Sequence, residues 1–206
     1  MLKIWGRATS SNVQKATWAL EELGIPYDRA DVGGPFGGLD KPEFKALNPN
    51  AKIPVIDDDG FILWESNVIV RYLAAKRKSE ALWPTDPKAR ATADMWMDWQ
   101  QTVMWMDYVV LIVGLVRTPP EKRDTAAIEA ARQRLIPVMT MLDAQLKKTP
   151  YLAGQNFTIA DIPAGVFAWR WFELPIERPS LPALEAWYKR LQARPAYQKI
   201  VMIPLA

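Results

Sequence analysis

The hydrophobic pattern of the first third of the chain alternates between strand-like and helix-like segments. Apolar runs at 2–5 and 27–32 predict strands, and apolar spacing over 13–23 predicts a helix that Gly24 and Pro26 end. Short apolar runs at 53–56 and 61–64, joined by an Asp-Gly turn, predict a hairpin. A short helix at 42–47 and a helix from Ser66, with Val68, Ile69, Tyr72 and Leu73 as its buried stripe, complete the order βαβαββα.

The rest of the chain has a helical pattern throughout. Residues 78–87 show little periodicity and are interpreted as a linker. Helices are predicted at 88–116, 124–148, 159–172 and 181–194. The expected organisation is therefore a small α/β domain at 1–77, a linker at 78–87 and an all-α domain at 88–206.

Composition narrows the chemistry. The 206 residues include no cysteine and no histidine, which excludes thiolate zinc sites, protein-thiol nucleophiles and histidine bases, and no metal site is expected. The net charge of +3 comes from scattered basic residues, so a nucleic-acid partner is not expected. The most apolar stretch, 108–116, is too short for a membrane span of about 20 residues. A cytoplasmic protein is the expectation.

Three junctions in the α/β part carry candidate ligand-binding groups. At the first helix, Ser11 and Gln14 fit a capping box, which leaves Ser10 as the hydroxyl free to face a ligand. From spacing alone, capping without a ligand is the favoured interpretation of this segment.

The second junction is Lys52-Ile53-Pro54-Val55, where a proline enters an expected strand. Either the Ile53–Pro54 bond is cis and the backbone of Ile53 faces a ligand, or an edge strand begins at Val55. The third junction is Glu65-Ser66 at the start of a helix, where a hydroxyl and free N–H groups can receive a carboxylate or simply cap the helix.

The segment from Met95 to Tyr108 is apolar on more than one helical face. Such a helix needs a second covered face beyond the domain core. A subunit interface or an apolar pocket would provide it.

The order of several short motifs resembles one known family, the cytosolic-type glutathione transferases, and within it the bacterial members with a serine or threonine at the active site. The resemblance covers essentially the whole chain. It rests on these motifs: Pro42-Glu43-Phe44, Leu47-Asn48-Pro49, Lys52-Ile53-Pro54-Val55, Glu65-Ser66, Ile69-Val70-Arg71-Tyr72-Leu73 and Phe157-Thr158-Ile159-Ala160-Asp161-Ile162.

The resemblance implies a thioredoxin-like N-terminal domain, an all-α C-terminal domain and a homodimer. It implies that Pro54 is cis, that the backbone of Ile53 pairs with the cysteinyl part of glutathione, and that Glu65 and Ser66 hold its γ-glutamyl end. A basic side chain such as Lys52 would meet the glycine carboxylate. Thr158 and Asp161 fit a reciprocal helix cap and are assigned to folding.

The chain has no cysteine, and it has Trp5 or Gly6 where other classes of the family have a tyrosine. The resemblance therefore favours activation of the glutathione thiol by Ser10, and Ser11 and Asn12 also lie within reach of that thiol. The expected activity is transfer of glutathione to small hydrophobic electrophiles, in detoxification. The expected electrophile site has these residues: Arg7, Met104, Trp105 and Tyr108. Glutathione-dependent disulfide reduction, isomerisation or dehalogenation is one alternative, and a non-catalytic carrier or assembly module is another.

Overall fold

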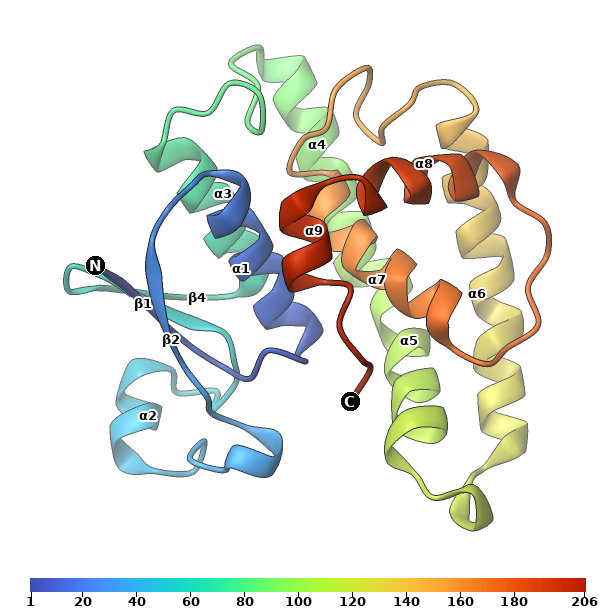
Figure 1. Ribbon diagram of the computed structural model, residues 1–206, viewed down its shortest axis with the longest axis horizontal. Helices are drawn as coiled ribbons and strands as arrows, with labels where there is room; N and C mark the ends of the chain where they lie inside the picture. The colour runs from blue at the N-terminus through green and yellow to red at the C-terminus, as the bar shows by residue number, and fades with distance from the viewer.

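The computed structural model describes all residues from 1 to 206 and places an α/β unit beside a larger helical unit (Figure 1). The α/β unit follows the predicted order βαβαββα with one added short 3₁₀ helix. Its elements are β1 (Leu2–Trp5), α1 (Ser11–Glu22), β2 (Tyr27–Ala30), η1 (Gly34–Phe36), α2 (Pro42–Leu47), β3 (Val55–Asp58), β4 (Phe61–Trp64) and α3 (Ser66–Lys76).

The four strands form one mixed sheet in the order β2-β1-β3-β4. Strand β1 runs parallel to β2, with Ile4 opposite Arg29, and antiparallel to β3, with Ile4 opposite Ile56. Ile4 and Ile56 are fully buried, so the centre of the sheet is apolar. Helices α1 and α3 pack against each other.

The helical unit contains more elements than the pattern predicts. Its elements are α4 (Pro87–Trp99), η2 (Gln100–Met104), α5 (Trp105–Ile112), η3 (Val113–Arg117), η4 (Pro120–Lys122), α6 (Thr125–Leu146), α7 (Asp161–Glu173), α8 (Pro182–Gln192) and α9 (Pro195–Ile200). The segments η2 and η3 are π-helical turns, while η4 is a 3₁₀ turn. Helix α9 and these turns are not anticipated by the sequence pattern.

Residues 87–117 form one continuous helical run that is long and apolar enough to cross a membrane by length and composition alone. In the fold, this run packs against α6 and α7. Its apolar residues on that side therefore belong to the core of the helical unit.

The two units share one hydrophobic core. Trp18 of α1 is fully buried, and its ring lies 5.5 Å from that of Phe157 and 4.7 Å from that of Tyr197. A Cβ at Gly165 of α7 would lie 2.9 Å from the Trp18 ring, so only glycine permits this approach of α1 and α7. Ion pairs such as Arg194 with Glu22, at 2.7 Å, add to this contact.

Some predicted boundaries differ from the observed ones. Strand β2 ends at Ala30 and β3 begins at Val55, two residues after Ile53. Val68 is exposed rather than buried, because the buried face of α3 is centred on Ile69 and Leu73. Residues 77–86, between α3 and α4, contain neither helix nor strand, and we propose the linker between the domains at 78–87, whose last residue begins α4.

Candidate active site

Ser10 lies at the N-terminal end of α1, and its side chain makes no capping hydrogen bond. It is the N-cap residue, and its C=O accepts from Gln14 N–H at 2.9 Å. The predicted capping box with Ser11 as N-cap is therefore wrong. The Gln14 side chain donates to Ile200 O at 3.0 Å and accepts from Arg170 at 2.8 Å, because α9 and α7 offer it better partners. The Ser10 hydroxyl thus stays available at a helix N-terminus.

The Ile53–Pro54 peptide bond is cis, as the first of the two sequence interpretations expects. Strand β3 nevertheless begins at Val55 and is a central strand, between β1 and β4. Neither the N–H nor the C=O of Ile53 makes a backbone hydrogen bond. Both groups can therefore pair with an extended peptide-like ligand.

Glu65 and Ser66 lie at the first turn of α3. Glu65 is exposed, has a φ of 72° and makes no capping hydrogen bond. A non-glycine residue in this left-handed region is uncommon, and such residues concentrate at ligand sites. Ser66 is buried and donates to Asn12 Oδ1 at 3.3 Å, which joins the N-terminal turns of α1 and α3.

The side chain of Lys52 is exposed, and its backbone oxygen accepts from Asn48 Nδ2 at 2.8 Å. Asn48 is itself buried. It also accepts from Asn50 N–H at 3.0 Å, so it fixes the loop that leads into Ile53. The predicted glutathione-binding residues therefore come from one connected set of loops and helix starts.

A cavity of about 190 Å³ opens beside Ser10, between the loop before α1 and the helices α5 and α7. The lining includes, besides Ser10, four residues that the sequence analysis names: Arg7, Ser11, Trp105 and Tyr108. Met104, the residue before Trp105, does not line this cavity, because it is fully buried in the core. Helical spacing alone does not show which of these neighbouring residues faces the cavity.

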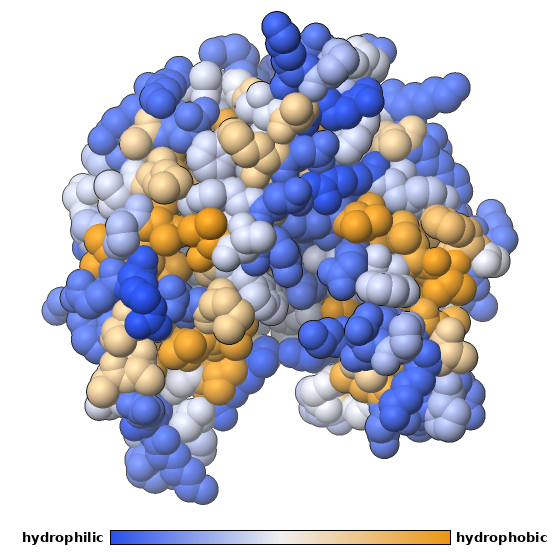
Figure 2. Space-filling view, turned by 180° about the vertical axis from the view of Figure 1, so that it is seen from behind, coloured by the Kyte–Doolittle hydropathy of each residue, from blue (hydrophilic) through white to orange (hydrophobic).

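The sequence analysis missed several residues of this cavity. Arg117 comes from η3, Arg170 from α7, and Leu205 and Ala206 from the C-terminal segment, which descends beside α5 (Figure 1). No local motif marks these positions. Only the packing of α7 and of the C-terminal segment against α1 brings them to Ser10. From behind, a notch separates the two lower lobes of the molecule (Figure 2).

Several buried groups near the site have altered pKa values. Burial, and to a smaller extent the nearby charge of Arg170, lower the pKa of Lys15 to about 7. Lys15 Nζ donates to Gln101 at 3.3 Å and lies 5.6 Å from the centre of the Phe167 ring. Burial raises the pKa of Tyr108, whose hydroxyl contacts Met139 Sδ at 3.7 Å. Tyr108 is thus engaged in the core.

The chain contains no group of three or more carboxylate, histidine or cysteine side chains placed to hold a metal ion. The arrangement that remains is a hydroxyl at a helix N-terminus, a free backbone strip and an adjoining cavity. Such a set can bind a peptide-like thiol, stabilise its anion and hold a second reactant beside it.

Comparisons with known proteins agree with this architecture. The family model "Glutathione S-transferase, N-terminal domain" matches residues 9–76, and "Glutathione S-transferase, C-terminal domain" matches residues 103–195. Glutathione S-transferase GstB of Escherichia coli is 41% identical over 208 residues, which cover 100% of both chains. Glutathione S-transferase 3 of Zea mays is 32% identical and covers 99% of this chain and 95% of its own.

Among solved structures, the theta class glutathione S-transferase of Xanthomonas axonopodis pv. citri with glutathione bound has a TM-score of 0.97 and 50% identity. The match covers 100% of this chain and 99% of that one. The α/β unit is accordingly thioredoxin-like, and the second unit is the all-helical domain of the same family. With both domain models matched in order and full-length relatives at this identity, the chain belongs to the glutathione S-transferase family.

Proposed function

We propose that this glutathione transferase activates the thiol of glutathione through Ser10 and directs the thiolate at an apolar electrophile in the adjoining cavity. The observation that carries the proposal is the uncommitted Ser10 hydroxyl at the N-terminus of α1, on the wall of that cavity. Glutathione supplies the nucleophile. The chain has neither cysteine nor histidine to take part in its place.

The energies involved are adequate. A free thiol has a pKa of about 8.5, and lowering it by about two units requires roughly 2.7 kcal/mol of preference for the thiolate. One hydrogen bond to a charged acceptor contributes about 1.5 to 3 kcal/mol, and a helix N-terminus about 0.3 to 1 kcal/mol. Ser10 and the first turn of α1 can therefore supply the shift together.

The remaining glutathione contacts are proposed from the same geometry. The unpaired backbone of Ile53 would pair with the cysteinyl residue, and Glu65 and Ser66 would hold the γ-glutamyl end. Lys52, exposed next to Ile53, would meet the glycine carboxylate. Asn12 would act through its hydrogen bond with Ser66.

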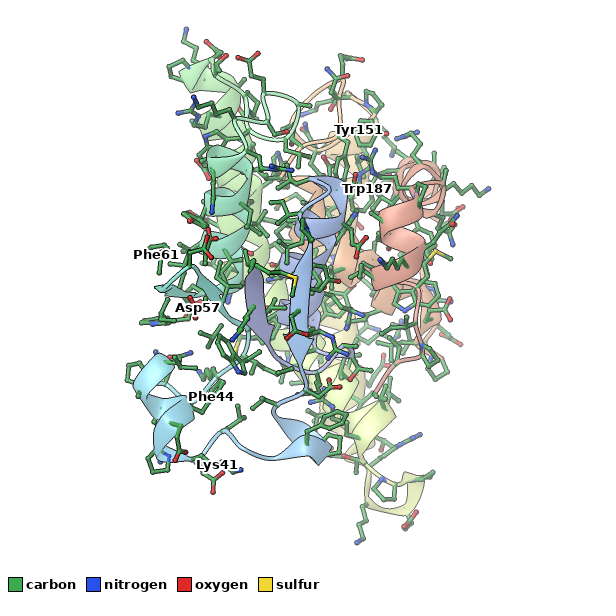
Figure 3. All side chains as sticks on the ribbon, turned by 60° about the vertical axis from the view of Figure 1, so that its left-hand side comes forward. Lys41, Phe44, Asp57, Phe61, Tyr151 and Trp187 are labelled. Atoms are coloured by element: carbon green, nitrogen blue, oxygen red, sulfur yellow. The ribbon has the colours of Figure 1, made fainter.

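We further propose a homodimer that works in the cytoplasm in detoxification. Exposed apolar side chains on α3, α4, η2 and α5 favour a covered face: Val68, Met95, Val103 and Met106. Phe61 on β4 is exposed too and lies at the outer margin of the molecule, away from Tyr151 and Trp187 (Figure 3). A cytoplasmic location fits because that compartment keeps the glutathione thiol reduced.

The first experiment is a pH titration of the thiolate absorbance of glutathione with and without the protein. We expect the bound thiol to ionise about two units below its free value, and Ser10→Ala to return about one unit or more of that shift. Ser11→Ala is the matched control and leaves the shift in place.

Asn12→Ala gives a smaller change than Ser10→Ala, because Asn12 acts through Ser66. Loss of the shift in Ser11→Ala alone would reassign the thiol contact. An unshifted bound thiol in the native protein would instead favour the non-catalytic carrier.

A further inference from the structure

Three arginines line the cavity beside Ser10. Arg7 comes from the loop between β1 and α1, Arg117 from η3 and Arg170 from α7. Arg170 is buried, Arg7 is half-buried and Arg117 is exposed, so positive charge extends from the inside of the cavity to its opening. The lining contains no aspartate or glutamate. Its other polar residues are Thr9, Ser10 and Ser11.

These arginines have no carboxylate side-chain partner. None of the ion pairs in the structure includes Arg7, Arg117 or Arg170. Arg170 donates to Thr9 O at 3.2 Å, to Val166 O at 2.9 Å and to Gln14 Oε1. Arg117 donates to Ala206 O at 3.1 Å. Ala206 supplies at most one negative charge, against the three positive charges of the arginines.

Arg7 is the least satisfied of the three. Its side chain makes no hydrogen bond within 3.5 Å, although a guanidinium carries five donors. A Cβ on Gly34 would lie 3.2 Å from both Cδ and Nε of Arg7, so the loop at η1 approaches this side chain closely and limits its movement. Arg7 is therefore held near the cavity with its donors unused.

The three charges act on one another. The pKa of Arg170 is lowered to about 10, chiefly by burial, and the charges of Arg117 and Arg7 contribute to the lowering. Burial and the charge of Arg117 lower the pKa of Arg7. Three grouped positive charges with at most one counter-charge are unfavourable in a partly buried site, and a bound anion relieves that repulsion.

The rest of the cavity wall is apolar. It is formed by these residues: Trp105, Tyr108, Val109, Ile112, Val113, Phe167, Leu205 and Ala206. An apolar wall combined with convergent guanidinium groups fits a small ligand that has an apolar body and an oxyanion, since guanidinium binds carboxylate and sulfonate with two parallel hydrogen bonds.

We propose that the preferred electrophile of this transferase is an apolar compound that carries a carboxylate or sulfonate, bound by Arg7 and Arg117 with Arg170 behind them. The inference rests on the proposed function, since it names the substrate class of the same site. In the reaction, a lone pair of the glutathione sulfur forms the new C–S bond. When the electrophile is an organic halide, the carbon–halogen bond breaks and halide leaves with its electron pair. The thiol proton passes to solvent, and the carboxylate or sulfonate stays on the product.

The test compares chlorodinitrobenzoate with chlorodinitrobenzamide, which differ in charge but hardly in shape. Each value of kcat/KM is divided by the uncatalysed rate constant with glutathione, because the two rings differ in intrinsic reactivity. We expect the benzoate to be favoured by about tenfold or more, as one charge-assisted hydrogen bond allows. Added salt should reduce the preference, mainly through the exposed Arg117.

The variants Arg7→Gln and Arg117→Gln should each lower the benzoate-to-amide ratio by about tenfold, chiefly through KM of the benzoate. Arg7→Lys should restore part of the ratio. The control Arg77→Gln removes one positive charge from an exposed site at the end of α3 and leaves the ratio unchanged. Circular dichroism checks that each variant is folded.

Equal acceleration of the two compounds, together with a shifted glutathione thiol, would overturn this inference and leave the proposed function standing. An unshifted thiol would instead count against the proposed function. If neither compound reacts, calorimetry with dinitrobenzoate and dinitrobenzamide on the glutathione-loaded protein decides: tighter binding of the anion supports the inference, and equal binding contradicts it.

Discussion

At the scale of single residues, the site combines groups whose neighbours leave them uncommitted. The Ser10 hydroxyl makes no capping bond, the backbone of Ile53 is unpaired, and Arg7 has no carboxylate partner. Lys15 differs, because it is fully buried with one side-chain acceptor, Gln101. A buried ammonium is unfavourable, and this lowers its pKa.

Lys15 predicts a pH dependence of stability. Its folded-state pKa is about 7, against an ordinary value of 10.5, so between these values the unfolded chain binds a proton that the folded chain lacks. Its contribution to stability therefore rises with pH through that window, by at most about 1.4 kcal/mol per pH unit. Arg170 and Glu65 are the charged groups that act on it.

We expect Lys15→Met to remove this rise. The unfolding free energy of the variant minus that of the native protein should then be larger at pH 7 than at pH 10, by on the order of 1–3 kcal/mol. Urea denaturation at the two pH values measures it. A difference between variant and native protein that does not change with pH would contradict the assignment.

At the scale of elements, the start of α7 is held by a buried carboxylate. Asp161 accepts from Leu152 N–H, Thr158 N–H and Trp187 Nε1–H at 2.9 to 3.0 Å. Thr158 Oγ1 accepts in turn from Ala160 N–H at 3.3 Å. The predicted reciprocal cap is therefore present, but the N–H that donates to Thr158 Oγ1 belongs to Ala160, one residue earlier than in a capping box. Its structural role fits the assignment of both residues to folding.

Asp161→Ala should destabilise the protein by about 3 kcal/mol or more, because three buried donors lose their acceptor at once. Asp161→Asn, which keeps one carbonyl oxygen, should cost less. Thermal or urea unfolding at pH 7 measures both. A loss below about 1 kcal/mol in Asp161→Ala would show that these bonds are replaced.

At the scale of the whole molecule, one helical run serves two surfaces. Between α4 and η3, the side facing α7 carries the cavity residues Trp105 and Tyr108, while Met95, Val103 and Met106 are exposed. The sequence pattern predicted that this run needs a second covered apolar face. Some of its apolar side chains line the cavity, and the proposed subunit interface would cover those that are exposed.

Met106→Glu and Met95→Glu should each shift the proposed dimer towards monomer, because a charge is placed in an apolar contact. Light scattering after size exclusion measures the mass. Met141→Glu on α6 is the control, since Met141 is similarly exposed but lies outside this face. A monomeric native protein, or dimers that persist in both variants, would contradict the proposed face.

The sequence by itself determined the order βαβαββα of the first unit and the division into an α/β and a helical unit. Its resemblance to a known family implied the cis bond before Pro54. Local patterns carry this information, because helix spacing, turn residues and capping motifs depend on neighbours a few residues apart. The same reasoning placed Ser10, Glu65 and Ser66 at helix starts.

Tertiary structure decided the capping of α1, the position of Met104 in the core, and the electrophile site. Gln14 hydrogen-bonds to residues of α7 and α9. The cavity beside Ser10 is also lined by Arg117, Arg170 and the C-terminal segment, which lie 107 to 196 positions after Ser10 in the sequence. No local pattern encodes such encounters, because they depend on how distant elements pack. The charge of the cavity therefore emerges only when the chain is folded.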